Sequence, residues 1–215
     1  MKIAIFGASG TIGQRITLEA LERGHEVIAL SRRATGFPIA HSHLHVVQVD
    51  ILDPASVAQA IRDADVVVNA TSGRASADVH EFYIRSTQST IEGVKQAGDK
   101  RLLVVGGAGS LEIAPGTQLV DTPDFPAAWR PGASAQRDTL ALYRVSDIDW
   151  TFFSPSALIA PGRRTGNYRL GTDYLLTNEQ GESYISAEDY AVALLDEIEH
   201  PQFLRKRFTA VSLEK

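Results

Sequence analysis

Three glycines near the amino terminus are spaced so that a phosphate could approach the backbone between them. They belong to the segment Gly7-Ala8-Ser9-Gly10-Thr11-Ile12-Gly13, which has the pattern G-x-x-G-x-x-G. The segment follows an apolar run at residues 2–6 and opens a stretch with helical spacing of its apolar residues. In that position small residues let a pyrophosphate reach the free N–H groups of a helix N-terminus. We therefore predict a dinucleotide site here, the alternative being an ordinary tight turn between a strand and a helix.

The residues after the second predicted strand indicate which dinucleotide is preferred. An enzyme that uses NAD commonly carries Asp or Glu about 20 residues past the glycines, where the acid binds the ribose hydroxyls. Here residues 26–30 are followed by Ser31, Arg32 and Arg33, which lie 18 to 20 positions after Gly13. A hydroxyl and two guanidiniums attract a 2′-phosphate that an acid would repel. We expect NADP(H) to be preferred, with NAD(H), and two merely solvated loop arginines, as the alternatives.

Two further strand ends carry residues suited to the same ligand. Asp50 and Ile51 follow the third predicted strand, where folds of this kind contact adenine, although Asp50 has the alternative role of capping a turn. Thr71, Ser72 and Gly73 close the fourth predicted strand, beside the expected nicotinamide ribose. Their backbone and hydroxyls suit that contact, and the alternative is a polar turn at a strand end.

The proton donor of standard short-chain dehydrogenases is missing from the sequence. That donor is a tyrosine with a lysine four residues later, and none of the six tyrosines has this partner. Counting back from Trp150 places the usual pair at Gly132 and Gln136. A standard alcohol–ketone dehydrogenase is therefore disfavoured, because no evident group would protonate a developing alkoxide. An oxidised flavin fits better, since it takes hydride at N5 and its second proton can come from water.

The elements that must position these residues alternate between short β-branched runs and amphipathic stretches. We expect strands at residues 2–6, 26–30, 44–49, 65–70, 101–105 and 150–153, and helices at 11–23, from 53 onward, 77–97, 133–145 and up to 199. Repeated strand–helix–strand units with near-continuous apolar strands predict an α/β fold. This is a doubly wound parallel sheet (Rossmann fold) with a small C-terminal substrate lobe.

Two stretches interrupt this alternation. Residues 106–132 and 155–181 are rich in Gly and Pro, and both follow strand carboxyl ends, where a doubly wound sheet binds its ligand. We expect them to be lid or substrate loops of a single NAD(P)-binding domain that spans residues 1–215.

Composition narrows the classes of function. The chain has 215 residues, of which 44% are apolar, and 21 Lys and Arg against 26 Asp and Glu give a net charge of −5. This balance argues against a partner that is nucleic acid or a membrane surface. The absence of cysteine excludes disulfides and thiolate ligands. With no long apolar run and no signal peptide, a cytoplasmic protein, monomeric or homodimeric, is expected.

Several motifs together resemble a known family. The opening residues 2–10 are shared among atypical short-chain dehydrogenases. More specific are the runs at residues 105–111, 149–155, 161–166 and 184–191, which read VGGAGSL, DWTFFSP, PGRRTG and YISAEDYA. Together they resemble the bacterial NADH-flavin reductases, a branch related to the biliverdin-IXβ/flavin reductases and the NmrA-like proteins. The similarity extends over essentially the whole chain.

The resemblance implies roles for particular residues. For the phosphates and the adenine, it implies that pyrophosphate is cradled by Gly7, Ser9, Gly10, Thr11 and Ile12, that Arg32 meets the 2′-phosphate, and that adenine lies between Asp50 and Ile51. For the other half of the dinucleotide, it implies that Ser72 and Gly73 lie near the nicotinamide ribose, and that the nicotinamide lies near Pro155, Ser156 and Ala157. Ser110 falls where the dehydrogenases often carry a catalytic serine, and it is the candidate for a hydrogen bond to a flavin or carbonyl oxygen.

Other polar residues have weaker interpretations. His80 starts the long helix after the fourth strand, and it is a candidate proton donor or, alternatively, a solvated first-turn histidine. His41, His43 and His45 alternate, but no carboxylate is close in sequence, so we expect no metal site. Arg163 and Arg164 suit either an anionic substrate or a solvated hairpin.

The leading hypothesis is an NADPH-dependent reductase for which FMN or FAD is a dissociable substrate. The alternatives are reduction of a small quinone or enone, and a non-catalytic redox sensor of the NmrA-like type.

Overall fold

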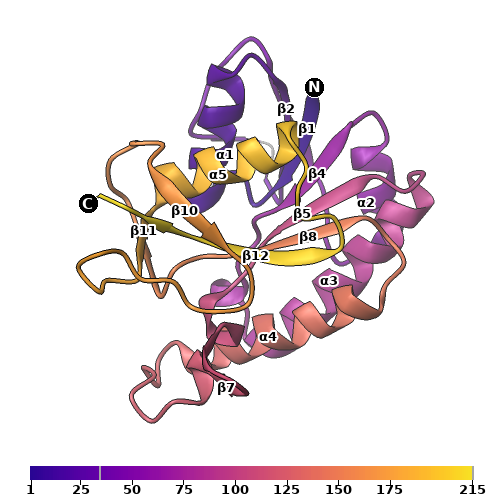
Figure 1. Cartoon of the computed structure of the whole chain (residues 1–215). Coiled ribbons are helices and arrows are strands. Elements are labelled where there is room, and N and C mark those ends of the chain that lie inside the picture. Colours follow the sequence, from indigo (N-terminus) through magenta and orange to yellow (C-terminus); the bar gives the residue numbers. More distant parts are fainter. Residues whose placement is uncertain (34, 215) are drawn as a thin grey trace.

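The computed structural model describes residues 1–33 and 35–214, and in this part of the chain an eight-stranded sheet forms the centre of the molecule (Figure 1). The sheet has the strand order β10-β12-β8-β5-β4-β1-β2-β3. Its strands are β1 (Lys2–Phe6), β2 (Glu26–Ser31), β3 (Leu44–Gln48), β4 (Val66–Asn69), β5 (Arg101–Val105), β8 (Trp150–Ser154), β10 (Tyr168–Gly171) and β12 (Lys206–Ser212). Every pairing is parallel except that of β10 with β12. The predicted doubly wound Rossmann fold is confirmed.

Helices cover both faces of this sheet. They are α1 (Thr11–Glu22), α2 (Pro54–Ile61), α3 (Val79–Gln96), α4 (Arg130–Val145) and α5 (Ala187–Glu199). Helices α1 and α5 pack together on one face, and α2, α3 and α4 pack side by side on the other (Figure 1). Among the described residues, no helix has the length and apolar character needed to span a membrane.

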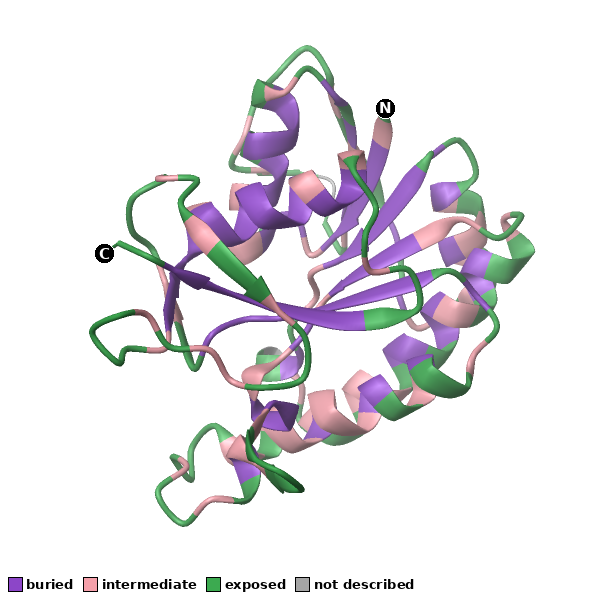
Figure 2. Cartoon of the chain, in the orientation of Figure 1, coloured by how far each residue is buried: buried purple, intermediate pink, exposed green. Residues whose placement is uncertain are grey.

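The core lies on both sides of the central strands, which are almost wholly buried (Figure 2). Under α1 and α5, the Phe153 ring stacks on Tyr190 and Phe208, with centroids 3.9 and 4.0 Å apart. Under α3 and α4, the core includes Tyr143 and Phe152. Burial on both faces explains why these strands are continuous apolar runs rather than alternating ones.

The six predicted strands are present, but the sequence prediction omits β12 and β10. Strand β12 begins with Lys206 and Arg207, and these two charged residues interrupt the apolar pattern by which a buried strand is predicted from sequence. Strand β10 is a half-exposed edge strand inside residues 155–181, so that stretch is not simply a loop. It also contains β9 (Leu158–Ala160), which pairs with β11 (Tyr184–Ser186).

The other irregular stretch, residues 106–132, consists of short elements. They are the 3-10 turns η2 (Ala108–Ser110) and η3 (Leu119–Asp121) and the hairpin strands β6 (Glu112–Ala114) and β7 (Thr117–Gln118). Arg130, which begins α4, donates hydrogen bonds to the carbonyls of Val120, Thr122 and Phe125 and so holds this stretch against the helix. A further 3-10 turn, η1 (Gly73–Ala75), follows β4.

Candidate functional site

The turn between β1 and α1 can be built only with glycine at two of its positions. Gly7 has a φ of +72°, and a Cβ added there would lie 2.5 Å from the carbonyl oxygen of Ala70. A Cβ added at Gly13 would lie 2.1 Å from the carbonyl oxygen of Gly7. Gly10 closes the turn by donating its N–H to that same carbonyl at 2.9 Å. The loop after β1 therefore packs directly on the loop after β4 and on the start of α1.

The first turn of α1 is left open to a ligand. Gly10 is the N-cap and offers no side-chain cap, and the first turn carries no acidic residue. Ser9, Gly10 and Thr11 are exposed, and Ile12 is half-buried. The first N–H groups of a helix have no partner within it, so these donors and the positive end of the helix dipole suit a pyrophosphate. The residues present therefore fit the phosphates of a dinucleotide.

The arginines after β2 are free to meet an additional phosphate. Arg32 and Arg33 are exposed, and within the described part of the chain neither guanidinium has a hydrogen bond or an ion pair with another residue. The backbone N–H of Arg33 donates to the Ser31 hydroxyl at 3.3 Å, which shapes the turn. Two unpaired cations on a protein with net charge −5 fit an anionic ligand such as a 2′-phosphate.

The loops after β3 and β4 are shaped by local hydrogen bonds. The Asp50 carboxylate is exposed and accepts from the backbone N–H of Leu52 at 2.9 Å, so it does cap a turn, while Ile51 is buried. After β4, the buried Asn69 amide oxygen accepts from the Thr71 N–H at 3.1 Å and the Thr71 hydroxyl at 2.6 Å.

The next residues bring this loop against α3. The Ser72 hydroxyl accepts from the backbone N–H of Arg74 at 3.4 Å. Gly73 is buried, and a Cβ added there would lie 3.1 Å from both the Phe82 and Tyr83 rings. Gly73, one of the predicted ribose contacts, therefore lies beside the Tyr83 ring.

Ser110 lies in the interior, in the 3-10 turn η2 that follows β5. It is 2% exposed, and its hydroxyl oxygen accepts from Nη1 of Arg207 at 3.0 Å. Arg207 is itself buried and is paired with Asp173 from the stretch 155–181. Because the hydroxyl accepts from Arg207, its own proton stays available for donation, and its contact with an electron acceptor remains a prediction.

The segment after β8 is held mainly by structural bonds. The buried Ser156 hydroxyl donates to the Ala210 carbonyl of β12 at 2.8 Å. Pro155 is buried, and Ala157 is exposed, with its N–H donating to the Ser183 hydroxyl at 3.0 Å. A contact with nicotinamide from this segment would therefore come from its backbone and from Ala157.

His80 links two helices. Its side chain is about half exposed, and Nε2 lies 2.9 Å from a carboxylate oxygen of Asp138 on α4. The histidine is therefore solvent-accessible, as expected for a solvated first-turn histidine, but it has an acidic partner.

The positions where a dehydrogenase would carry its tyrosine and lysine are occupied differently. Gly132 faces open space. Gln136 donates from Nε2 to the hydroxyl of Tyr83 at 3.4 Å, and a Cβ on Gly107 would lie 2.2 Å from its amide oxygen. Tyr143 is fully buried, and this burial raises its pKa to about 12 although the neighbouring Thr87 and Asn69 side chains oppose the shift. Sequence reasoning missed Tyr83, because its partner is on another helix.

Comparison with known proteins identifies the family. A model of NAD(P)H-binding proteins matches residues 7–201 of the chain. The chain belongs to the NAD(P)H-binding family.

Similar solved structures support this assignment to the NAD(P)H-binding family. A "putative NADH-flavin reductase" from Streptococcus pneumoniae is 35% identical, with a TM-score of 0.88 and 99% of each chain covered. A "putative epimerase" from Bacteroides thetaiotaomicron is 42% identical, with a TM-score of 0.92 and coverage of 100% of this chain and 98% of the other. A "putative exported protein" from Burkholderia pseudomallei is 48% identical, with a TM-score of 0.88 and coverage of 98% and 99%. The suspected family is confirmed at this level.

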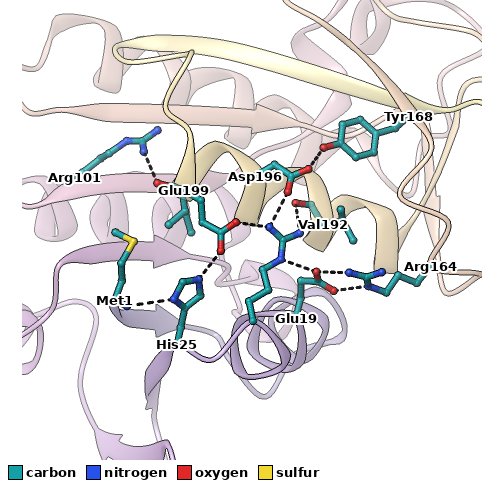
Figure 3. A network of polar contacts seen from close by, with 11 residues as sticks. Met1, Glu19, His25, Arg101, Arg164, Tyr168, Val192, Asp196 and Glu199 are labelled. Atoms are coloured by element: carbon teal, nitrogen blue, oxygen red, sulfur yellow. Dashed lines mark hydrogen bonds and ion pairs between the residues drawn. The ribbon is translucent and has the colours of Figure 1, made fainter.

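In this NAD(P)H-binding protein the segment 161–166 is docked onto α5 and α1. The Gly162 N–H donates to Glu188 at 2.7 Å, and the Thr165 N–H and hydroxyl donate to the fully buried Asp189 carboxylate at 2.7 Å. Arg164 makes two hydrogen bonds of 2.7 Å to Glu19 (Figure 3). Arg164 is half exposed, and its charge is already compensated by the Glu19 carboxylate.

The three alternating histidines are exposed, His41 and His43 just before β3 and His45 on it. His41 and His43 make an edge-to-face ring contact with centroids 5.5 Å apart. Among the described residues, no group of three or more histidine and acidic side chains is arranged to hold a metal ion.

Proposed function

We infer that the protein is a reductase that prefers NADPH and delivers hydride to a flavin or another planar acceptor. The observation that carries this proposal is the combination of the open α1 N-terminus with unpaired Arg32 and Arg33 where an NAD enzyme carries an acid. The "putative NADH-flavin reductase" among the similar structures supports the reaction type.

The chain's own residues would act by binding and orienting. The N–H groups at the start of α1 would hold the pyrophosphate, and Arg32 would hold the 2′-phosphate in a charge-assisted contact. The segment from Thr71 to Gly73 would position the nicotinamide ribose. When bound, the dinucleotide supplies hydride, and the protein supplies orientation at the carboxyl edge of the sheet.

Two features favour an acceptor such as a flavin over an alcohol or ketone. Gly132 and Gln136 stand where the coupled tyrosine and lysine would lie, and the buried Tyr143 is inaccessible to a substrate. A flavin spreads the incoming charge over its own ring system, so it depends less on such a dyad. We propose FMN or FAD as a dissociable substrate, because the sequence shows no second dinucleotide motif.

The test is an anaerobic mixture of protein, NADPH and excess FMN, followed by loss of nicotinamide absorbance, with NADH run in parallel. We expect turnover that is faster with NADPH. Arg32→Glu should weaken NADPH binding roughly 10- to 100-fold, since charged hydrogen bonds contribute about 1.5–3 kcal/mol, and should change NADH binding far less.

The matched control is Arg62→Glu, the same charge reversal at the end of α2, where the strands begin rather than end. It should leave both affinities unchanged. Equal losses of NADPH and NADH affinity in Arg32→Glu would show that the 2′-phosphate lies elsewhere. Tight NADPH binding without turnover of FMN would refute the flavin acceptor and favour another acceptor or a redox sensor.

A further inference from the structure

Tyr83 and Gln136 meet where the loops after β4 and β5 end. Tyr83 belongs to α3 and its ring lies against Gly73, while Gln136 belongs to α4 and its amide lies against Gly107. The amide Nε2 and the phenol oxygen are 3.4 Å apart. This distance is long for a hydrogen bond, as is common in sites that tighten only around a ligand.

This pair is continuous with the dinucleotide cradle. Gly7 packs on Ala70 and Thr71 in the loop after β4. Gly73, two residues after Thr71 in that loop, packs on Tyr83. From there Gln136 reaches Gly107 after β5. A doubly wound sheet binds its ligand along this carboxyl edge, so Tyr83 occupies the edge on the side of β4 and β5.

Tyr83 also borders a small polar cavity between α3 and α4. The cavity is about 10 Å³, close to the space of one water, and its lining beside Tyr83 includes Asn69, Ser86, Thr87, Gln136 and Thr139. These side chains carry a hydroxyl or an amide. Polar groups around the phenol make this wall of the site suited to an oxygen-bearing ligand rather than to an apolar one.

Three of the other five tyrosines are unsuited to the same task. Tyr143 and Tyr190 are fully buried, and the Tyr190 hydroxyl donates to the Phe153 carbonyl at 2.7 Å. The Tyr168 hydroxyl donates to Asp196 on the opposite face of the sheet. Tyr83, by contrast, is half-buried, and it borders the small polar cavity.

We propose that Tyr83 is the catalytic acid of this site and that Gln136 is its positioning residue. The inference rests on the proposed reductase function and extends its substrate class to acceptors with a conjugated carbonyl, such as quinones and enones. Helix α3 then supplies the phenol that α4 lacks, and a neutral amide replaces the usual ammonium beside it.

Hydride carries two electrons from the reduced nicotinamide, which is thereby oxidised, to the electrophilic carbon or nitrogen of the acceptor. The acceptor is reduced, and negative charge gathers on its conjugated oxygen. The Tyr83 O–H bond breaks as a new O–H bond forms to that oxygen, and the phenolate recovers a proton from water. The Gln136 N–H stabilises the phenolate meanwhile.

The first experiment compares Tyr83→Phe with wild type, using NADPH with FMN and with a 1,4-naphthoquinone. We expect kcat to fall by about 10- to 100-fold, at or below the usual size of general acid catalysis. The affinity for NADP⁺ alone should be unchanged. Binding of FMN or the quinone to the protein–NADP⁺ complex should weaken by about 3- to 10-fold, because one hydrogen bond is lost.

The second measurement is the pH profile of kcat. Wild type should lose activity at alkaline pH, where the proton of a catalytic phenol is lost, and Tyr83→Phe should lack this limb. Gln136→Lys places a cation beside the hydroxyl and should move the limb to lower pH. Other charged side chains nearby on α3, α4 and η1 are His80, Asp138, Arg137 and Arg74, and the first three are linked in ion pairs.

Tyr168→Phe is the matched control, since it removes a phenol hydroxyl on the far side of the sheet. It should change stability but neither kcat nor its pH profile. If wild type turns over and Tyr83→Phe matches it in kcat, acceptor affinity and pH profile, the Tyr83 inference is wrong while the reductase function stands. If wild type reduces neither acceptor, the proposed function itself fails, and the binding of acceptors to the NADP⁺ complex still tests Tyr83.

Discussion

Glu19 is the residue whose replacement should destabilise the fold in a calculable way. It lies on α1, its side chain is 4% exposed, and it joins Arg23, the C-cap of that helix, to Arg164 of the segment 161–166 (Figure 3). Its carboxylate accepts one hydrogen bond of 2.8 Å from Arg23 and two of 2.7 Å from Arg164. We predict that Glu19→Gln lowers the free energy of unfolding.

The magnitude follows from the exposure of the partners. Removing one member of a buried ion pair costs about 3–5 kcal/mol. Arg164 is half exposed, so part of its share is screened by water, and Arg23 keeps Asp196 and Glu199, each at 2.7 Å. We therefore expect a loss of about 2–3 kcal/mol. In a chain of 215 residues this lowers the melting temperature by about 5–10 °C.

The pH dependence provides a sharper form of this prediction. Burial alone would raise the pKa of Glu19, but the hydrogen bonds and charges of Arg164 and Arg23 outweigh it and hold the pKa below its ordinary value near 4.5. The stabilisation is therefore fully present above that value and is lost as the pH falls through it towards the native pKa. Glu19→Gln cannot titrate at this position, so the gap between wild type and variant should narrow at pH 4 and below.

The assay is urea unfolding followed by circular dichroism at pH 7 and at several acidic pH values. Glu26→Gln is the control, because Glu26 is half exposed and its Lys2 partner is 3.5 Å away, and it should cost less than about 0.5 kcal/mol. A Glu19→Gln variant as stable as wild type at pH 7 would refute the reasoning. A gap that widens towards acid would show that the sign of the pKa shift is wrong.

Two further pairs of substitutions test the local geometry. Gly13→Ala should destabilise the fold and abolish NADP⁺ binding, measured by tryptophan fluorescence, because its Cβ would lie 2.1 Å from the Gly7 carbonyl oxygen. The control Gly132→Ala enters open space on α4 and should raise the free energy of unfolding by about 0.5–1 kcal/mol. A Gly13→Ala variant with wild-type stability and NADP⁺ affinity would contradict this packing. Asp189→Ala should lower the free energy of unfolding in urea by about 2–4 kcal/mol, since it leaves two N–H groups of the segment 161–166 without an acceptor. Asp189→Asn should lower it by about 1 kcal/mol, since the amide oxygen still accepts. Equal losses would show that the carboxylate oxygens are not the relevant acceptors.

Much of the dinucleotide cradle could be predicted from sequence because its signals are local. The three glycines lie within seven residues at a strand–helix junction, and the strands that carry the site are continuous apolar runs. The arginines at the end of β2 could be found from sequence because they come directly after a predicted strand. Such features depend on backbone conformation over a few residues, which the sequence pattern specifies by itself.

What the sequence left open depends on how distant elements pack. Gln136 reaches Tyr83 across 53 residues only because α3 lies against α4, and Arg207 reaches Ser110 across 97 because β12 joins the sheet beside β8. Asp189 lies in the first turn of α5, and its buried carboxylate binds the segment 161–166. These partners are chosen by strand order and by helix packing, and no local pattern encodes either.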